Sequence, residues 1–241
     1  MTRMIPATIH DSVPSKAERA IFKTIRDAPN TDNWVCLHSL ALAHHDTKRR
    51  AEIDFVLLTR QGIFVLECKG GRLRRQRGVW YSIDKEDVRH KLSESPFDQA
   101  SSAMFALQRR IRAQFKNEPY GDPLFGYGVL TPDFDFDLES PEFDRKQVYD
   151  LRDTAHDFTR YINRLAEYSR AAEARDKRPA LKPEAIDAIA HYLRGDFDFI
   201  PSANALIDNV RHQLDELTQE QRIVLDVLQD SERVLVDGGA G

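Results

Sequence analysis

Three ionisable residues, Asp54, Glu67 and Lys69, lie in a stretch whose other residues are typical of buried β-strands. Segments 51–59 and 63–69 are rich in Ile, Val, Leu and Phe, and the turn residues between them predict a β-hairpin. An unpaired charge is costly to desolvate, so charged side chains rarely enter such strands without a partner. A divalent cation is the simplest partner for two carboxylates.

A two-residue turn at 61–62 would set the register of this hairpin, starting from a pair between Arg60 and Ile63. The same ladder would place Asp54 opposite Lys69, and Glu67 two residues further along. Opposed residues share a face, so all three ionisable side chains would converge, with the two carboxylates as diagonal neighbours about 7 Å apart. A slip of one residue would separate Asp54 from the other two.

Two carboxylates beside a lysine suit the hydrolysis of a phosphodiester. Oxygen ligands favour Mg²⁺ or Mn²⁺, which stay partly hydrated and can bridge carboxylates to a phosphate. Such an ion polarises the phosphoryl oxygen and lowers the pKa of a bound water. Lys69 could orient or deprotonate that water and offset the charge that develops on the phosphorus centre. The alternative is structural: a buried Asp54–Lys69 pair, with Glu67 at a strand end near solvent.

The spacing D-x12-E-C-K after a helix carrying Glu18 resembles the PD-(D/E)xK nuclease superfamily, and within it the nuclease-related domain named NERD. The proline that gives the superfamily its name is absent, since Ile53 stands before Asp54. The resemblance covers about the first 150 residues. Its pieces are SKAERAIFKTI at 15–25, AEIDFVLLTRQGIFVLECKG at 51–70, SPFDQASSAMFALQRRI at 95–111 and GYGVL at 126–130.

The resemblance implies a role for each of these polar residues. The implied catalytic residues are Asp54, Glu67, Lys69, Glu18 and Gln99. The implied ligands of Mg²⁺ or Mn²⁺ are Asp54, Glu67 and the peptide carbonyl of Cys68. The implied partner is nucleic acid, with DNA as the expected substrate.

The two helical residues also have simpler interpretations. Residues 15–18 form a capping box, in which Glu18 can simply satisfy a backbone N–H. Gln99 lies in the first turns of a predicted helix, beside its apolar stripe, and can face either the site or solvent. The Cys68 side chain is expected to point into the core as a small apolar group.

Basic residues flank the carboxylate segment, and phosphate binding requires such local positive charge. The candidate nucleic-acid contacts are Arg49, Arg50, Arg72, Arg74, Arg75 and Arg109. Trp80 and Tyr81 follow on the next predicted strand, where a ring can stack on an unpaired base, although core packing is the stronger prediction for Trp80. The net charge of −4 argues against a generally basic nucleic-acid binder.

The acidic stretch at 133–144 offers a second, weaker metal-site hypothesis. A strand there would align Asp133, Asp135 and Asp137 on one face. We instead expect a solvated loop with Phe134 and Phe136 turned inward.

Length and composition indicate a globular enzyme. The 241 residues, 41% hydrophobic and 31% charged, can bury a full domain core with residues left over. Two cysteines exclude a disulfide framework or a zinc ligand set. No apolar stretch has membrane-spanning length and the first residues lack a signal-peptide core, so we expect a cytoplasmic protein without a membrane partner.

The order of the predicted elements favours an α/β fold: a restriction-endonuclease-like mixed β-sheet flanked by helices, with a helical C-terminal extension. The predicted elements are helix 15–27, strand 33–40, the hairpin 51–69, strand 78–83, helix 96–115, strand 125–130, a short strand at 147–150 and an amphipathic helix at 155–175. The predicted domains are a nuclease domain at 1–152, a helical extension and linker at 153–212, and the truncated start of a helicase domain at 213–241.

The last 25 residues resemble the opening of a superfamily 1 helicase. Gln221 corresponds to its adenine-reading glutamine, and Gly238 and Gly241 to the first half of a phosphate-binding loop. The sequence stops before the Lys and Ser/Thr that complete such a loop, so ATP would bind only in a longer parent protein with a covalently linked helicase domain. The resemblance to NERD-bearing nuclease–helicases implies a role in DNA processing or in defence against invading DNA.

The sequence therefore predicts a metal-dependent nuclease that forms the N-terminal part of a nuclease–helicase. The alternative is a catalytically inactive nucleic-acid-binding or recruitment module for the helicase, in which the carboxylates are only structural. Uptake of one metal ion per chain, lost on Asp54→Asn, would distinguish the two.

Overall fold

The computed structural model describes residues 1–10, 13, 15–42, 51–83, 87–172, 178 and 180–196. The chain divides into two compact units, Met1–Gly195 and Asp196–Gly241. All the described residues except Asp196 belong to the first unit. Five of the predicted site residues lie outside the described residues: Arg49, Arg50, Gln221, Gly238 and Gly241.

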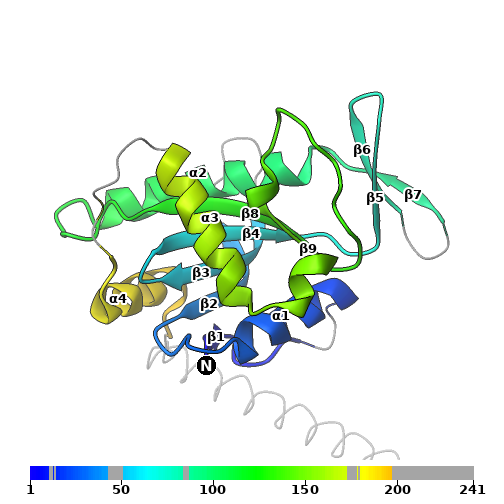
Figure 1. Cartoon of the computed structure of the whole chain (residues 1–241). Coiled ribbons are helices and arrows are strands. Elements are labelled where there is room, and N and C mark those ends of the chain that lie inside the picture. Colours follow the sequence, from blue (N-terminus) through cyan, green and yellow to red (C-terminus); the bar gives the residue numbers. More distant parts are fainter. Residues whose placement is uncertain are drawn as a thin grey trace, which may run out of the picture. The chain divides into compact units, whose positions relative to one another are not determined.

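The centre of the first unit is a six-stranded mixed sheet in the order β1-β2-β3-β4-β8-β9 (Figure 1). Its strands are β1 (Arg3–Ile5), β2 (Val35–Leu42), β3 (Ala51–Thr59), β4 (Gly62–Cys68), β8 (Phe125–Thr131) and β9 (Val148–Asp150). β2, β3 and β4 pair antiparallel, whereas β4, β8 and β9 pair parallel. The carboxyl ends of β4, β8 and β9 therefore meet at one edge of the sheet.

Two helices cover each face of this sheet (Figure 1). α1 (Lys16–Asp27) and α3 (Phe158–Ala172) pack on one face, and α2 (Pro96–Gln114) and α4 (Pro183–Arg194) on the other. In α1 the buried residues Ala17, Ile21 and Ile25 recur every four positions, which gives the helix one apolar side. None of the described helices is long and apolar enough to span a bilayer.

A separate antiparallel sheet follows β4 and projects from the body of the unit (Figure 1). Its strands are β5 (Arg72–Gln76), β6 (Val79–Ile83) and β7 (Arg89–Lys91). Two short 3₁₀ helices, η1 (Arg145–Gln147) and η2 (Leu151–Ala155), flank β9.

The predicted fold class, a mixed β-sheet flanked by helices with further helices toward the C-terminus, is confirmed. Strands β1, β5 and β7 were not predicted. β1 and β7 have only three residues each, and β5 is almost entirely polar, so none shows a clear apolar pattern. α3 and α4 lie within the extension predicted at 153–212 and pack against the same sheet. The predicted domain boundaries stay predictions.

The acidic stretch after β8 is a loop with its aromatic residues turned inward, as predicted. Phe136 is buried against Phe97 and Phe143, and Phe134 packs beside them. Trp80 lies in the same cluster, so its predicted core role is also confirmed. Asp135 and Asp137 both pair with Arg152, in a loop rather than along one face of a strand.

Glycines on β8 allow α3 to lie directly on the sheet. The Tyr161 hydroxyl donates to the Gln147 carbonyl oxygen at 2.9 Å, above Gly128. A Cβ atom added at Gly128 would lie 2.0 Å from Tyr161 Oη, far inside van der Waals contact. The close approach of α3 therefore depends on the missing side chain.

We predict that Gly128→Ala lowers the free energy of unfolding by about 1–3 kcal/mol, because the buried ring must move. In the Tyr161→Phe background the same change should cost less, because the hydroxyl is gone and the closest remaining contact is the Gln147 carbonyl oxygen, 2.8 Å from the added Cβ atom. Urea denaturation of the four proteins measures both effects. Strictly additive losses would contradict this account of the contact.

Candidate active site

The β3–β4 hairpin differs from the predicted register by two residues. Thr59 pairs with Gly62 and Phe55 with Leu66, so the turn is 60–61 rather than 61–62. The predicted pairs of Arg60 with Ile63 and of Asp54 with Lys69 are therefore wrong. Continuing the observed ladder by one step places Asp54 level with Glu67. Since side chains alternate with a period of two, the shift preserves the predicted faces within the paired segments 55–59 and 62–66.

The side chain of Thr59 explains the position of the turn. Its hydroxyl oxygen accepts the N–H groups of Gln61 and Gly62, at 3.1 and 3.3 Å. Gly62 is the first residue of β4, where a Cβ atom would lie 2.6 Å from the Leu124 carbonyl oxygen. The glycine therefore makes room for a neighbouring backbone instead of forming the turn.

The Asp54 side chain provides the hydrogen-bond acceptor for β4 where the backbone pairing of β3 and β4 ends. The last backbone pair is Phe55 with Leu66. Beyond it, the Cys68 N–H donates to Asp54 Oδ2 at 2.8 Å, while the next N–H along, that of Lys69, donates to β8 at 2.9 Å. The Asp54 carboxylate thus satisfies a backbone donor that a continuing strand would otherwise have paired. The Cys68 side chain lies in the core cluster beneath α1, as predicted.

Glu67 and Lys69 form an ion pair beside this carboxylate. Lys69 Nζ donates to Glu67 Oε1 at 2.6 Å, and the two side chains are only 21% and 12% exposed. The structural alternative, a buried Asp54–Lys69 pair with Glu67 near solvent, does not have this geometry, because Lys69 pairs with Glu67 and Glu67 is buried.

The electrostatics of the cluster favour a neutral Asp54 and a charged Lys69. Burial, followed by the charge of Glu67, raises the pKa of Asp54 well above its usual range. Burial alone would lower the pKa of Lys69, but the charge of Glu67 and its hydrogen bond to Nζ raise that pKa above its ordinary value. The two carboxyl groups therefore resist simultaneous ionisation unless more positive charge is nearby.

Glu18 joins the cluster from the first turn of α1. The Ser15 hydroxyl accepts the Glu18 N–H at 3.2 Å, which confirms the predicted N-cap. The Glu18 carboxylate, however, lies 2.7 Å from His38 Nε2 instead of capping the helix. Its charge contributes to the raised pKa of Asp54, so the two carboxylates lie in one electrostatic cluster.

His38 is the member of this cluster that sequence reasoning missed. It lies on β2 with 3% of its surface exposed, between the rings of Phe22 and Phe55. Its partner Glu18 is 20 residues away in sequence. A histidine inside the largely apolar strand VCLHSLAL was the available signal, because buried histidines need a hydrogen-bond partner.

The alternation of faces breaks beside Asp54. The pair of His38 with Phe55 packs on the α1 side of the sheet, whereas the next pair, Leu40 with Ile53, packs on the α2 side. Residues two apart on a strand ordinarily share a face. Ser39, between these pairs, has φ of 55°, a left-handed conformation that is unusual for serine. The backbone thus twists where Asp54 sits.

Gln99 lies near the start of α2, which packs on the face of the sheet opposite to α1. Its Oε1 atom is buried and has no hydrogen-bond partner among the described residues. The residue as a whole is half-buried, so whether Gln99 faces the site or solvent stays a prediction.

The donor set fits a hard divalent cation. Two carboxylates, the Cys68 carbonyl and the Gln99 oxygen are all oxygen donors, which Mg²⁺ and Mn²⁺ prefer. No group of three or more His, Cys, Asp or Glu side chains in the described part of the chain is arranged as a metal site. Mg²⁺ does not need one, since it keeps several waters and takes one or two carboxylates.

The predicted basic contacts differ from one another in their surroundings. Arg72 pairs with Asp87 at 2.9 Å and Arg75 with Glu142 at 2.7 Å. Arg74 is exposed and has no ionic partner among the described residues, and Arg109 is exposed on α2. Local positive charge thus remains available mainly on β5.

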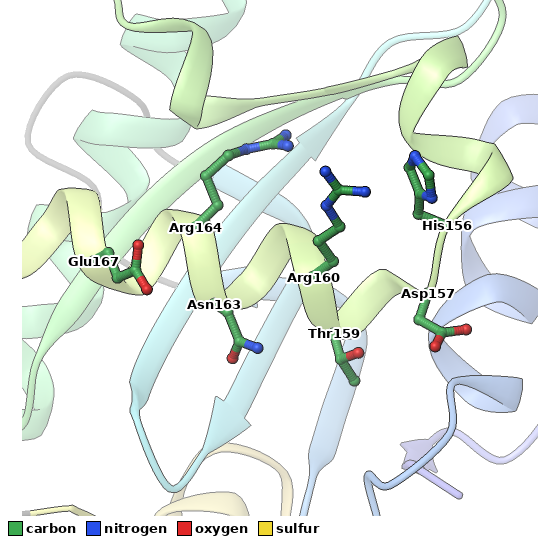
Figure 2. Close-up of a pocket in the computed structure, with 7 residues that line it drawn as sticks. All are labelled: His156, Asp157, Thr159, Arg160, Asn163, Arg164 and Glu167. Carbon is green, nitrogen blue, oxygen red and sulfur yellow. The ribbon is translucent and has the colours of Figure 1, made fainter.

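A surface hollow of about 490 Å³ lies along α3, away from these residues. Figure 2 shows that its side chains diverge around the helix: Arg160 and Arg164 point to one side, and Thr159 and Asn163 to the other. Arg164 is bound to Asp153 at 2.9 Å. Since its polar groups do not converge on a common point, the hollow is a poor candidate for catalysis.

Comparison with known proteins agrees with the geometry. The NERD family, described as a nuclease-related domain, matches residues 14–131, which include Glu18, Asp54, Glu67, Lys69 and Gln99. No curated protein and no solved structure matches the chain. Residues 14–131 of this chain therefore form a NERD domain, a nuclease-related domain.

Proposed function

We propose that this protein is a Mg²⁺- or Mn²⁺-dependent nuclease that hydrolyses phosphodiester bonds of nucleic acid, with DNA as the expected substrate. The observation that carries the proposal is the closeness of Asp54 and Glu67 just beyond the last backbone pair of β3 and β4, where their charges oppose each other. A cation removes this opposition. The NERD match supports a nuclease-related function for the same segment.

In this proposal Asp54, Glu67 and the Cys68 carbonyl hold the ion. When bound, the ion polarises a phosphoryl oxygen and makes a bound water more acidic. Lys69 stays protonated because Glu67 raises its pKa, so it offsets the negative charge that grows on the phosphate during attack. Glu18, held by His38, accepts a hydrogen bond from the attacking water and orients it.

Removal of a carboxylate tests the chemistry. Asp54→Ala or Glu67→Ala should lower the rate of cleavage about 100-fold or more, because each removes a ligand. Cleavage of labelled oligonucleotides in Mg²⁺, with EDTA as the blank, measures the rate. Glu167→Ala, which removes an exposed carboxylate on α3, is the matched control and should cut like the parent. Full activity in either site variant would refute the assignment, and an inactive parent protein would favour the recruitment module.

Asp54→Asn should stabilise the metal-free protein at neutral pH. The pKa of Asp54 is raised in the folded chain, so its contribution to stability is complete below the ordinary carboxyl pKa, about 4, and is lost as pH rises through the raised value. The neutral amide of Asn does not ionise, so it avoids this loss of stability. Its oxygen can still accept the hydrogen bond from the Cys68 N–H. The melting temperature of the variant should exceed that of the parent near pH 7.5, with the difference shrinking toward about pH 4.

The same measurement with Mg²⁺ provides the second half of the test. The ion should raise the melting temperature of the parent and leave that of Asp54→Asn unchanged, because binding stabilises only the protein that can hold the ion. An equal rise in both proteins would show that the ion binds elsewhere.

His38 is expected to act through Glu18. His38→Phe removes the group that holds the carboxylate and should lower the cleavage rate about as much as Glu18→Ala. Because both changes break one contact, the double variant should be little slower than either single variant. Cleavage rates of the four proteins form the cycle, and multiplicative losses would show that the two residues act independently.

We further propose that the NERD domain works beside a helicase domain in a longer parent protein. The motif around Gln221 and the glycines from Gly238 to Gly241 support this link, although the NERD match itself ends at residue 131. The mass of the native gene product tests this proposal. A native product that ends at Gly241 would contradict it.

A further inference from the structure

The projecting β5–β6–β7 sheet is far more basic than the rest of the chain. Residues 72–91 contain seven Lys or Arg and three Asp or Glu, in a chain whose net charge is −4. Charge concentrated on one small element has a functional meaning more often than charge spread over a surface.

The strand register places these basic residues in rows with an aromatic ring among them. Arg74 pairs with Tyr81, and Tyr81 with Lys91. In the next row Arg72 and Arg89 flank Ile83. Directly opposed residues share a face, so these residues form one face of the sheet, here named the outward face.

The opposite face of the same sheet packs on the body of the unit. Trp80 is buried against Phe97. Arg75 lies over the Trp80 ring at 5.6 Å and is bound to Glu142. The basic residues Arg74, Arg89 and Lys91 of the outward face are exposed and have no ionic partner among the described residues. Tyr81 is half-buried between them, and Ile83, in the neighbouring row, is buried.

The sheet is attached directly to the candidate active site. β5 begins three residues after Lys69, through Gly70 and Gly71. The Gly71 N–H donates to Asp133 Oδ2 at 2.8 Å, and a Cβ atom at Gly70 would lie 2.7 Å from Ala17 Cβ. These contacts fix the base of the sheet against α1 and the loop that follows β8. The five residue steps from Lys69 to Arg74 span at most about 17 Å.

We propose that the outward face binds a nucleic-acid strand with unpaired bases and leads it to the carboxylates. Arg74, Arg89 and Lys91 contact phosphates, and Tyr81 stacks on a base. The charge suits any polyanion, but a ring set between cations suits a chain that alternates phosphates with exposed π-faces. Bases inside a duplex are already stacked and cannot take this position. The inference rests on the proposed nuclease function, because it identifies the substrate of that site.

Binding in EDTA tests the inference without cleavage. We use the full chain and a fluorescein-labelled 20-nucleotide single strand, its duplex and heparin as probes. Tyr81→Ala should weaken single-strand binding about tenfold and duplex binding less than twofold, whereas Tyr81→Phe should bind like the parent because it keeps the ring. The Arg74→Ala, Lys91→Ala double variant should lower the salt slope by about 1.4.

Matched controls separate this face from the general surface. Lys23→Ala removes an exposed charge on α1, and Tyr192→Ala removes an exposed ring on α4. Both should bind the single strand like the parent. Equal loss for single strand and duplex in Tyr81→Ala, unchanged binding in that variant, or heparin binding with the same dependence on Tyr81 would each overturn the inference.

The two proposals fail separately. A protein that cuts in Mg²⁺ but binds single strands without using the outward face would leave the nuclease in place and refute this inference. A protein that binds as expected but never cuts would refute the nuclease and leave the binding face standing.

Discussion

The carboxylates of Asp54 and Glu67 oppose each other where β3 and β4 part, and the rest of the site is arranged around that opposition. Burial strengthens the repulsion and raises the pKa of Asp54. The Cys68 N–H, the Lys69 ammonium and the His38–Glu18 contact each satisfy one part of the cluster. None of them neutralises both carboxylates. In the function we propose, a divalent cation does so, which would link the fold to phosphodiester chemistry.

The scaffold supports this point from distant parts of the sequence. Arg194, at the end of α4, donates to the carbonyl oxygens of His38 at 2.6 Å and of Ser39 at 2.5 Å. Ser39 has the left-handed backbone beside Asp54, a conformation that costs energy and persists only when its surroundings hold it. Burial lowers the pKa of Arg194, as expected for a guanidinium inserted between elements. The C-terminal helix of the unit thus stabilises the strand distortion that sets the carboxylate in place.

The sequence predicts the faces of the site better than its contacts. A shift of two residues preserves the alternation along the paired part of the hairpin, and Asp54 and Glu67 lie within electrostatic reach of each other although the turn was misplaced. The hydrogen bond that the Thr59 hydroxyl accepts fixes the position of the turn, and such a local contact leaves no periodic pattern in the sequence. His38 could not be paired with Glu18 from sequence, since only the packing of α1 on β2 brings them together. The polar strand β5 gave no apolar pattern, and its partners Arg89 and Lys91 lie on a three-residue strand.

The most direct test of the central claim is a crystal of the protein soaked in Mn²⁺ and measured at the manganese absorption edge. We predict an anomalous peak between the carboxylates of Asp54 and Glu67, bonded also to the Cys68 carbonyl, and no peak there in Asp54→Asn. A soaked parent crystal with Lys69 still bound to Glu67 and no peak between the two carboxylates would contradict it.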